Sequence, residues 1–272
     1  MDKTAIYYDI AYATQHSSQK MDIYEPSLDG VEPGTLFPLM VYVHGGFWMD
    51  RDKSDYLTMG RYFASKGIVV AVVNYRLSKK AHKVPVRYPT HNQDLAQAIS
   101  WLVDNQSDYR YDSNNIHLVG HSCGAHMISM IALKPTDYLT PSSPYTIRSC
   151  IGIQGIYDIS QLIRDYPDYI SEIEFVFNSS SDWEAPQQIV SHGRSDYNAS
   201  LKWLIVHAPT DQLVNPPQSS NFVTHLSQQC KYTNVESFTD AQGSHFAVVM
   251  KLGEEEEKSL DNLRSAILTF IK

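Results

Sequence analysis

Short apolar runs rich in β-branched residues recur along this chain, and they constrain its fold more than any other feature. Typical examples are "PLMVYVHG" and "GIVVAVVNYR". Runs that are apolar at nearly every position are typical of strands buried on both faces, as in a parallel sheet. The runs lie at 38–45, 67–76, 115–120, 147–158, 201–211 and 234–241.

Amphipathic stretches lie between these runs. "DYLTMGRYFASKG" ends at Gly67, a residue that suits the end of a helix. The segment 90–105 has one apolar helical face, with Thr90 as its expected N-cap. Two segments at 6–13 and 19–26 predict an antiparallel pair that opens the sheet. The alternation predicts an α/β fold whose central sheet is mostly parallel, with helices on both faces.

We expect a single domain over residues 1–272, because this length suits one large core and no linker interrupts the alternation. The segment 159–200 does not fit the pattern, since it combines aromatic residues, prolines and a serine cluster. It predicts a small, partly helical cap insertion over the ends of the strands. The final "EEEEKSLDNLRSAILTFIK" predicts a helix with Glu254 to Glu257 in its first turn, where the helix dipole favours negative charge.

Composition argues against several classes of function. The net charge is −8 and the chain has no basic stripe, so nucleic-acid binding is not expected. No run reaches the ~18 apolar residues of a membrane span, and the N-terminal stretch lacks the apolar core of a signal peptide. Three cysteines without paired spacing fit a reducing compartment. We therefore expect a soluble cytoplasmic protein.

The segment "VGHSCGAH" contains a G-x-S-x-G pattern centred on Ser122. An apolar run stops at Gly120 and a helical stretch follows Ser122 at once, so the turn is sharp and presents the hydroxyl at the carboxyl edge of the sheet. Cys123 is one step past the apex, which disfavours it as the nucleophile. His121 and His126 do not have the i, i+4 spacing of helical zinc ligands. A βα turn with a plain surface serine is the remaining alternative.

A nucleophilic serine needs a histidine to take its proton and a carboxylate to orient that histidine. In a doubly wound hydrolase the acid follows a late strand and the histidine follows the last one. Asp211 ends the run "WLIVHAPTD", and His245 lies in a glycine-containing loop after the final run. Asp158 comes one strand early and is expected to cap the next segment, while Asp240 is too close to the histidine. We predict a triad of Ser122, Asp211 and His245.

The early loop "VYVHGGFWMDRD" is expected to complete the site. Its two glycines expose backbone N–H groups without obstruction, so Gly46 and Phe47 can donate hydrogen bonds to an oxyanion. The backbone N–H of Cys123 is the expected third donor. His44 is expected to hold this loop by hydrogen bonds and to take no part in proton transfer.

Taken together, "HGGFW", "GHSCGAH", "GIYD", Asp211 and "SHF" resemble the α/β-hydrolase superfamily. The H-G-G-x-W form is similar to the kynurenine formamidase (arylformamidase) group. The likeness runs from about Tyr12 to the C-terminal helix. It implies an α/β-hydrolase fold with the same triad and the same three oxyanion donors. The sequence departs from the group at Cys123, where a small residue is frequent, and the cap is the least similar part.

We expect a serine hydrolase that cleaves an N-formyl amide of an aromatic amine, or a small carboxylic ester, through an acyl-enzyme on Ser122. A general carboxylesterase is the alternative, and a non-catalytic binding module is a third hypothesis. A small-molecule substrate is the expected partner, a homodimer stays open, and no metal or cofactor is expected. Aromatic residues are expected to line the entrance, with substrate contacts from Trp48, Tyr157, Phe175 and Trp183; the wider set adds Phe47, Tyr166, Tyr169 and Phe177.

Overall fold

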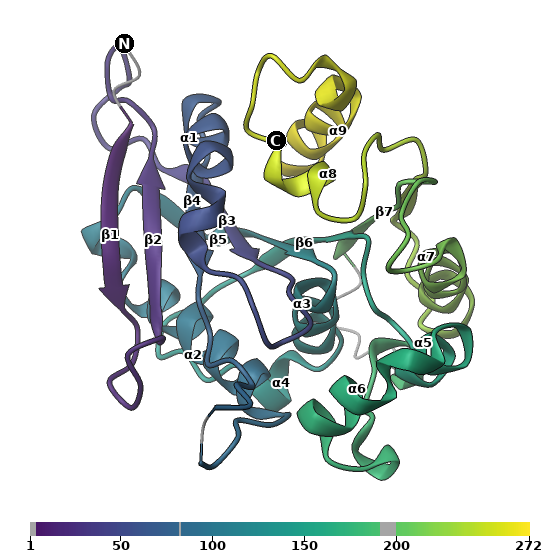
Figure 1. The fold of residues 1–272 in the computed structure, drawn as a ribbon. Coiled ribbons are helices and arrows are strands. Elements are labelled where there is room, and N and C mark those ends of the chain that lie inside the picture. Colours follow the sequence, from purple (N-terminus) through teal and green to yellow (C-terminus); the bar gives the residue numbers. More distant parts are fainter. Residues whose placement is uncertain (1–3, 82, 191–199) are drawn as a thin grey trace.

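A single eight-stranded sheet forms the centre of the computed structural model, which describes residues 4–81, 83–190 and 200–272 (Figure 1). The strands are ordered β1-β2-β4-β3-β5-β6-β7-β8. The pairs β1–β2 and β2–β4 are antiparallel, and all pairs from β4 to β8 are parallel. The predicted mostly parallel sheet and its antiparallel opening pair are confirmed. The bounds are β1 (Ala5–Ala11), β2 (Lys20–Glu25), β3 (Phe37–Val43), β4 (Val69–Val73), β5 (Tyr111–His121), β6 (Ile147–Ile153), β7 (Lys202–Val206) and β8 (Val235–Phe238).

Alternate residues of the central strands enter two separate cores. In β3, Leu39 and Val41 belong to one buried cluster, and Met40 and Tyr42 belong to the other. This follows from the two-residue period of a strand, because successive side chains point to opposite faces. Helices α2 (Thr90–Asp104), α3 (Cys123–Leu133) and α7 (Pro216–Thr224) contribute to the first core, whereas α1 (Leu57–Ser65) and α9 (Asp261–Ile271) contribute to the second. Helices therefore cover both faces, as predicted (Figure 1).

The segment between β6 and β7 departs from the alternation. Its described part, up to residue 190, holds α5 (Ile159–Asp165), α6 (Ile170–Phe177) and several short 3₁₀ turns. The rest of the expected cap, 191–199, lies outside the described residues. Two four-residue helices, α4 (Pro135–Tyr138) and α8 (Ala247–Met250), complete the set. Within the described ranges, no helix combines the length and apolar character needed to cross a membrane.

The acidic run near the C-terminus does not begin the last helix. Helix α9 starts at Asp261, after the run, so the expected dipole role of Glu254 to Glu257 was wrong. The buried guanidinium of Arg264 explains the difference, because it donates hydrogen bonds to the carbonyl oxygens of Leu252, Glu254 and Glu257. A helix through this run would direct those carbonyls along its own axis, so the chain instead wraps around the cation.

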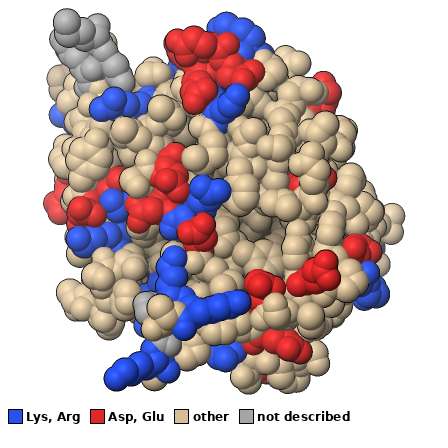
Figure 2. All heavy atoms as spheres, in the orientation of Figure 1, with Lys and Arg blue, Asp and Glu red and all other residues tan. Residues whose placement is uncertain are grey.

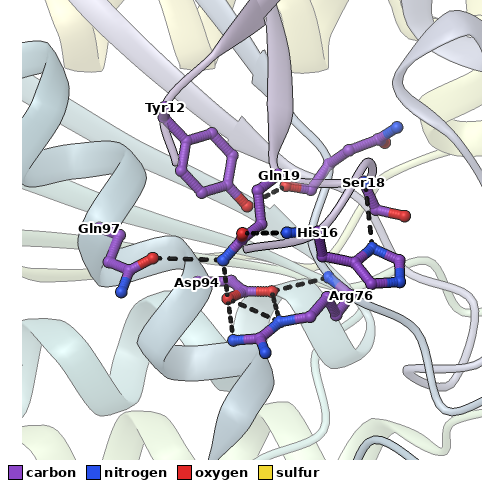
Figure 3. A network of polar contacts seen from close by, with 8 residues as sticks. Tyr12, His16, Ser18, Gln19, Arg76, Asp94 and Gln97 are labelled. Atoms are coloured by element: carbon purple, nitrogen blue, oxygen red, sulfur yellow. Dashed lines mark hydrogen bonds and ion pairs between the residues drawn. The ribbon is translucent and has the colours of Figure 1, made fainter. Parts of the chain in front are cut away.

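A buried ion pair joins the opening hairpin to the rest of the fold (Figure 3). Asp94 of α2 is fully buried and accepts hydrogen bonds from the guanidinium of Arg76 at 2.6 and 2.8 Å. Its Oδ1 also accepts from the side-chain amide of Gln19 at 2.8 Å. These contacts connect the β1–β2 loop, the segment after β4 and helix α2. The helix itself starts at Thr90, and its N-cap position is taken by Pro89 rather than by the threonine.

Replacing Asp94 with alanine should destabilise the protein by about 3 kcal/mol, because Arg76 would keep a half-buried charge without a partner. Urea unfolding followed by circular dichroism measures this change. The matched control is Gln93→Ala, at an exposed position of the same helix, which should shift the free energy of unfolding by less than about 0.5 kcal/mol. Equal effects from the two variants would contradict a structural role for the buried pair.

Three buried histidines should make the fold sensitive to acid. Burial lowers the pKa of His91 to about 3 and of His117 and His126 to about 4. In the unfolded chain these rings bind protons below pH ~6.5, so stability is complete above that pH and falls as the pH drops towards 4. Each ring contributes a slope of up to about 1.4 kcal/mol per pH unit.

The free energy of unfolding, measured between pH 4.5 and 7, should show this slope. His117→Gln should reduce the slope by the contribution of one ring, up to about 1.4 kcal/mol per pH unit, whatever its effect on stability at pH 7. His117 suits this test because its two ring nitrogens contact only Ser149 and Asn115, within the β5–β6 region and away from the strand ends. A slope that stays the same in the variant would show that this ring is protonated in the folded state.

Candidate active site

Ser122 lies on a strained turn between β5 and α3. Its φ and ψ are 54° and −120°, a left-handed conformation that a non-glycine residue adopts only at an energetic cost. Close backbone contacts on both sides explain the flanking glycines. A Cβ on Gly120 would lie 2.5 Å from the carbonyl oxygen of Gly124, and a Cβ on Gly124 would lie 2.2 Å from the carbonyl oxygen of Val43. The G-x-S-x-G spacing is therefore a packing requirement of this turn.

His245 and Asp211 form a buried pair at the carboxyl ends of the last strands. The Nδ1 of His245 donates to Oδ2 of Asp211 at 2.7 Å, and the two side chains are 4% and 0% exposed. The other carboxylate oxygen accepts the backbone N–H groups of Leu213 at 2.8 Å and Val214 at 3.0 Å. Because Nδ1 is held by the carboxylate, Nε2 is the ring nitrogen left to exchange a proton.

Two further buried histidines fix the loops of the site. His121 donates from Nε2 to the carbonyl oxygen of His245 at 2.8 Å. Burial, reinforced by the neighbouring His245, lowers the pKa of His121 well below its usual range, so the ring is neutral and carries its proton on Nε2. His44 donates from Nδ1 to the carbonyl oxygen of Gly45 at 2.8 Å and stacks on Tyr75, in line with its expected loop-holding role. The sequence marked His121 as structural and gave no sign of its contact with the His245 loop.

The loop after β3 has an unusual backbone. Gly46, Phe47 and Trp48 have φ values of +105°, +56° and +58°. Such a run turns successive N–H groups away from the regular strand pattern, and concave groups of N–H donors bind anions. The N–H of Cys123 is the first of helix α3, where no intrahelical acceptor exists. The backbone N–H groups of Gly46, Phe47 and Cys123 are the three predicted oxyanion donors.

The side chain of Cys123 ties this loop to α3. Its Sγ accepts the backbone N–H of Trp48 at 3.2 Å, and the residue is completely buried. Burial raises the pKa of the thiol to about 11, so it stays protonated and is no nucleophile near neutral pH. The side chain therefore points into the core and takes no room from the site, although a small residue is frequent at this position in the group.

A cleft of about 500 Å³ opens above these groups. Ser122 and His245 both line it, together with residues of the β3 loop, of the α5–α6 segment and of the loop after β7. Figure 2 shows a hollow near the centre of this face, bordered by charged side chains of both signs. Across the described ranges, no three histidine, cysteine or acidic side chains gather as a metal-binding group. The lining residues are Gly46, Phe47, Met49, Asp50, Arg51, Ser122, Asp168, Tyr169, Glu172, Leu213, Val214, His245 and Phe246.

Two of the expected substrate contacts were wrong. Trp48 and Tyr157 are both 0% exposed. The positive φ at Trp48 turns its ring into the core, where it packs edge-on against His126 and Phe177. Tyr157 stacks on Phe222 with ring centroids 4.1 Å apart. Both rings therefore support the walls of the site from behind.

The other two expected contacts also lie outside the cleft lining. Phe175 lies beneath the guanidinium of Arg87, and Trp183 borders a separate hollow beside Tyr88. Of the wider aromatic set, Phe47 and Tyr169 do line the cleft. Phe246 also lines the cleft and was missed, although its place directly after the predicted base was a usable signal.

Comparison with known proteins places this chain in a family. The family model BD-FAE matches residues 21–226. Kynurenine formamidase avaC from Aspergillus versicolor is 30% identical over 239 residues, which cover 76% of this chain and 81% of that protein. The kynurenine formamidase of Danio rerio is 25% identical over 259 residues, covering 93% of this chain and 78% of that protein.

A solved structure shows the same fold. The crystal structure of an inhibited esterase B from Lactobacillus rhamnosis superposes with a TM-score of 0.77 at 17% identity, and the match covers 99% of this chain and 87% of that one. At this identity the likeness speaks for the fold alone. The family match and the sequence relatives carry the assignment further: the chain belongs to the BD-FAE family and is an α/β-hydrolase related to the kynurenine formamidases.

Proposed function

We propose that this chain is a serine hydrolase that cleaves an N-formyl amide of an aromatic amine, or a small carboxylic ester, through an acyl-enzyme on Ser122. The observation that carries the proposal is the buried Asp211–His245 pair on the cleft that also exposes the strained Ser122 turn. The relatives named kynurenine formamidase support the formamide as the preferred substrate.

In the first step, Nε2 of His245 takes the proton of the Ser122 hydroxyl as the oxygen attacks the substrate carbonyl. Asp211 keeps the histidine in the required tautomer and stabilises the imidazolium that forms. The carbonyl oxygen becomes an oxyanion that the N–H groups of Gly46, Phe47 and Cys123 bind. Each such donor stabilises the transition state by about 3 kcal/mol.

In the second step, His245 gives its proton to the leaving amine or alcohol, and the C–N or C–O bond breaks. Water then attacks the acyl-enzyme with His245 as general base, and the acid is released with Ser122 restored. The histidine ends each cycle neutral. Because hydrolysis changes no oxidation state, the site turns over without any outside reductant or oxidant.

The same chemistry serves esters, and relatives named esterases keep a carboxylesterase as the second candidate. Aromatic walls favour an aryl substrate, because the rings of Phe47, Tyr169 and Phe246 line the cleft and can pack against a planar leaving group. We also propose a cytoplasmic location. The buried thiols of Cys123, Cys150 and Cys230 form no disulfide among the described residues, which supports a reducing compartment.

Asp211→Asn should lower kcat by about 10,000-fold with little change in KM. The asparagine oxygen can still accept the N–H groups of Leu213 and Val214, so its amide would face Nδ1 of His245 and force the ring proton onto Nε2. That tautomer cannot accept the serine proton. The matched control is the exposed rival acid, Asp240→Asn, which should keep kcat within a few-fold. A similar loss in both variants would refute the assignment of the acid.

Initial rates should favour N-formylkynurenine over p-nitrophenyl acetate by about tenfold or more in kcat/KM. Both compounds offer an aryl leaving group to the aromatic walls, but only N-formylkynurenine also carries an amino-acid side chain that can contact the cleft. Ser122→Ala should abolish both activities in a protein that still folds. A large preference for the ester would replace the formamidase assignment with the carboxylesterase, and hydrolysis that survives in the serine variant would disprove the acyl-enzyme.

A further inference from the structure

Arg51 places a positive charge on the wall of the active-site cleft. Its guanidinium lies over the ring of Phe246, with Cζ 4.3 Å from the ring centroid, and Phe246 directly follows His245 in the chain. Its Cγ is also close to the proposed oxyanion loop, since a Cβ on Gly46 would lie 2.9 Å from it. The arginine is thus packed between the loop that is proposed to bind the oxyanion and the loop that carries the histidine.

This cation has no anionic partner in the part of the chain that the structure describes. Arg51 makes no ion pair or hydrogen bond there, and its Nε is buried without an acceptor. The adjacent Asp52 is directed elsewhere: its carboxylate accepts the backbone N–H of Ser54 and the side-chain amide of Asn74. Burying the Nε–H without an acceptor is costly, because this donor has left water without a replacement.

The other acidic groups of the cleft do not fill this role either. Asp50 lies 4.0 Å from the ammonium of Lys79, and Glu172 lies 3.8 Å from that of Lys80. Asp168, on the rim, is exposed and makes no ion pair with the arginine. The free cation therefore faces a space that substrate would enter.

The backbone at this position makes the arginine harder to explain as a structural residue. Arg51 has a φ of +81°, in the region that favours glycine or asparagine. A residue that holds this conformation costs about 1 kcal/mol or more relative to glycine. Strain of this kind is typical of functional sites, where the side chain contributes something that a glycine would not.

We propose that Arg51 is a specificity residue that binds an anionic group, a carboxylate in the first instance, on the substrate. This inference rests on the proposed function and names its substrate class: acylated or formylated molecules that carry a negative charge near the reacting carbonyl. The guanidinium offers a planar pair of N–H donors that matches a carboxylate. Its contact with the ring of Phe246 helps to hold the guanidinium at the wall of the cleft.

Two matched substrate pairs test the proposal, since the charge can lie on either side of the scissile bond. N-formylkynurenine and its methyl ester differ in a carboxylate on the leaving group. Mono-p-nitrophenyl succinate and p-nitrophenyl butyrate differ in a carboxylate on the acyl group. The readout is the ratio of kcat/KM for the member that carries the carboxylate to kcat/KM for the member that lacks it. A general loss of structure would lower kcat/KM for both members of a pair and leave this ratio unchanged.

Arg51→Gln should lower the ratio by about 10- to 100-fold for at least one pair, as expected when a charged hydrogen bond is lost. Arg51→Lys should retain part of the preference, because it keeps the charge without the planar fork. The matched control is Arg61→Gln, which removes the same charge from an exposed position of α1 and should keep the ratio of the parent protein. Ratios that stay the same in the Gln variant for both pairs would overturn the proposal.

Binding in a Ser122→Ala background separates this inference from the proposed function. Calorimetric titration should show that N-formylkynurenine binds more tightly than its methyl ester, or that the succinate ester binds more tightly than the butyrate, and that Arg51→Gln removes the difference. Equal binding within both pairs, or no binding by any of the four compounds, would refute the anion site. Failure of the hydrolase proposal would show itself differently, as absent turnover or as turnover that survives without Ser122.

Discussion

The close approach of the α3 N-terminus to the end of β3 is the contact on which the candidate site depends. Gly124 lies so near the carbonyl of Val43 that a single Cβ would come within 2.2 Å of it. This approach brings the first N–H of the helix beside the loop that follows β3, and the Cys123 sulfur then holds the Trp48 N–H of that loop. Two segments about eighty residues apart in the sequence thus present their N–H groups together.

Strain at the site is sustained by this packing. Ser122, Phe47, Trp48 and Arg51 all have positive φ values, and each costs free energy relative to an ordinary conformation. The flanking groups that hold them are buried: the indole of Trp48 is in the core, and the chain around Ser122 is fixed by its N–H bond to the carbonyl of Ile153. Neutral buried histidines add directional hydrogen bonds without introducing charge. The rigid core therefore supplies the order that the proposed chemistry needs.

The residues proposed as the triad could be located from the sequence because chain order and strand ends determine where they lie in the fold. Parallel strands bring their carboxyl ends to one edge, so residues just after the runs at 115–120, 201–211 and 234–241 had to be neighbours. The aromatic contacts could not be predicted in the same way. Trp48 lies in a run of three positive φ values and its side chain is in the core, and the residue types of this loop do not reveal that backbone path. The Glu254 to Glu257 run misled because Arg264, seven to ten residues further along the chain, binds the carbonyl oxygens of Glu254 and Glu257, and the residue pattern does not reveal this contact.

The charge of Arg51 in the cleft, which is unpaired within the described ranges, is likewise a result of tertiary contacts that the local sequence pattern does not show. In the sequence, Arg51 stands in the run "MDRDKSD", where it reads as one exposed charge among several of both signs. In the folded chain its neighbours have other partners. The carboxylate of Asp52 accepts a hydrogen bond from Asn74, and the ammonium of Lys53 lies 2.8 Å from the almost fully buried carboxylate of Asp22. Arg51, by contrast, has neither an ion pair nor a hydrogen-bond acceptor for its buried Nε among the described residues. A cation isolated in this way, beside a strained backbone and on the wall of a proposed catalytic cleft, is better explained by an anion that arrives with the substrate than by the stability of the fold.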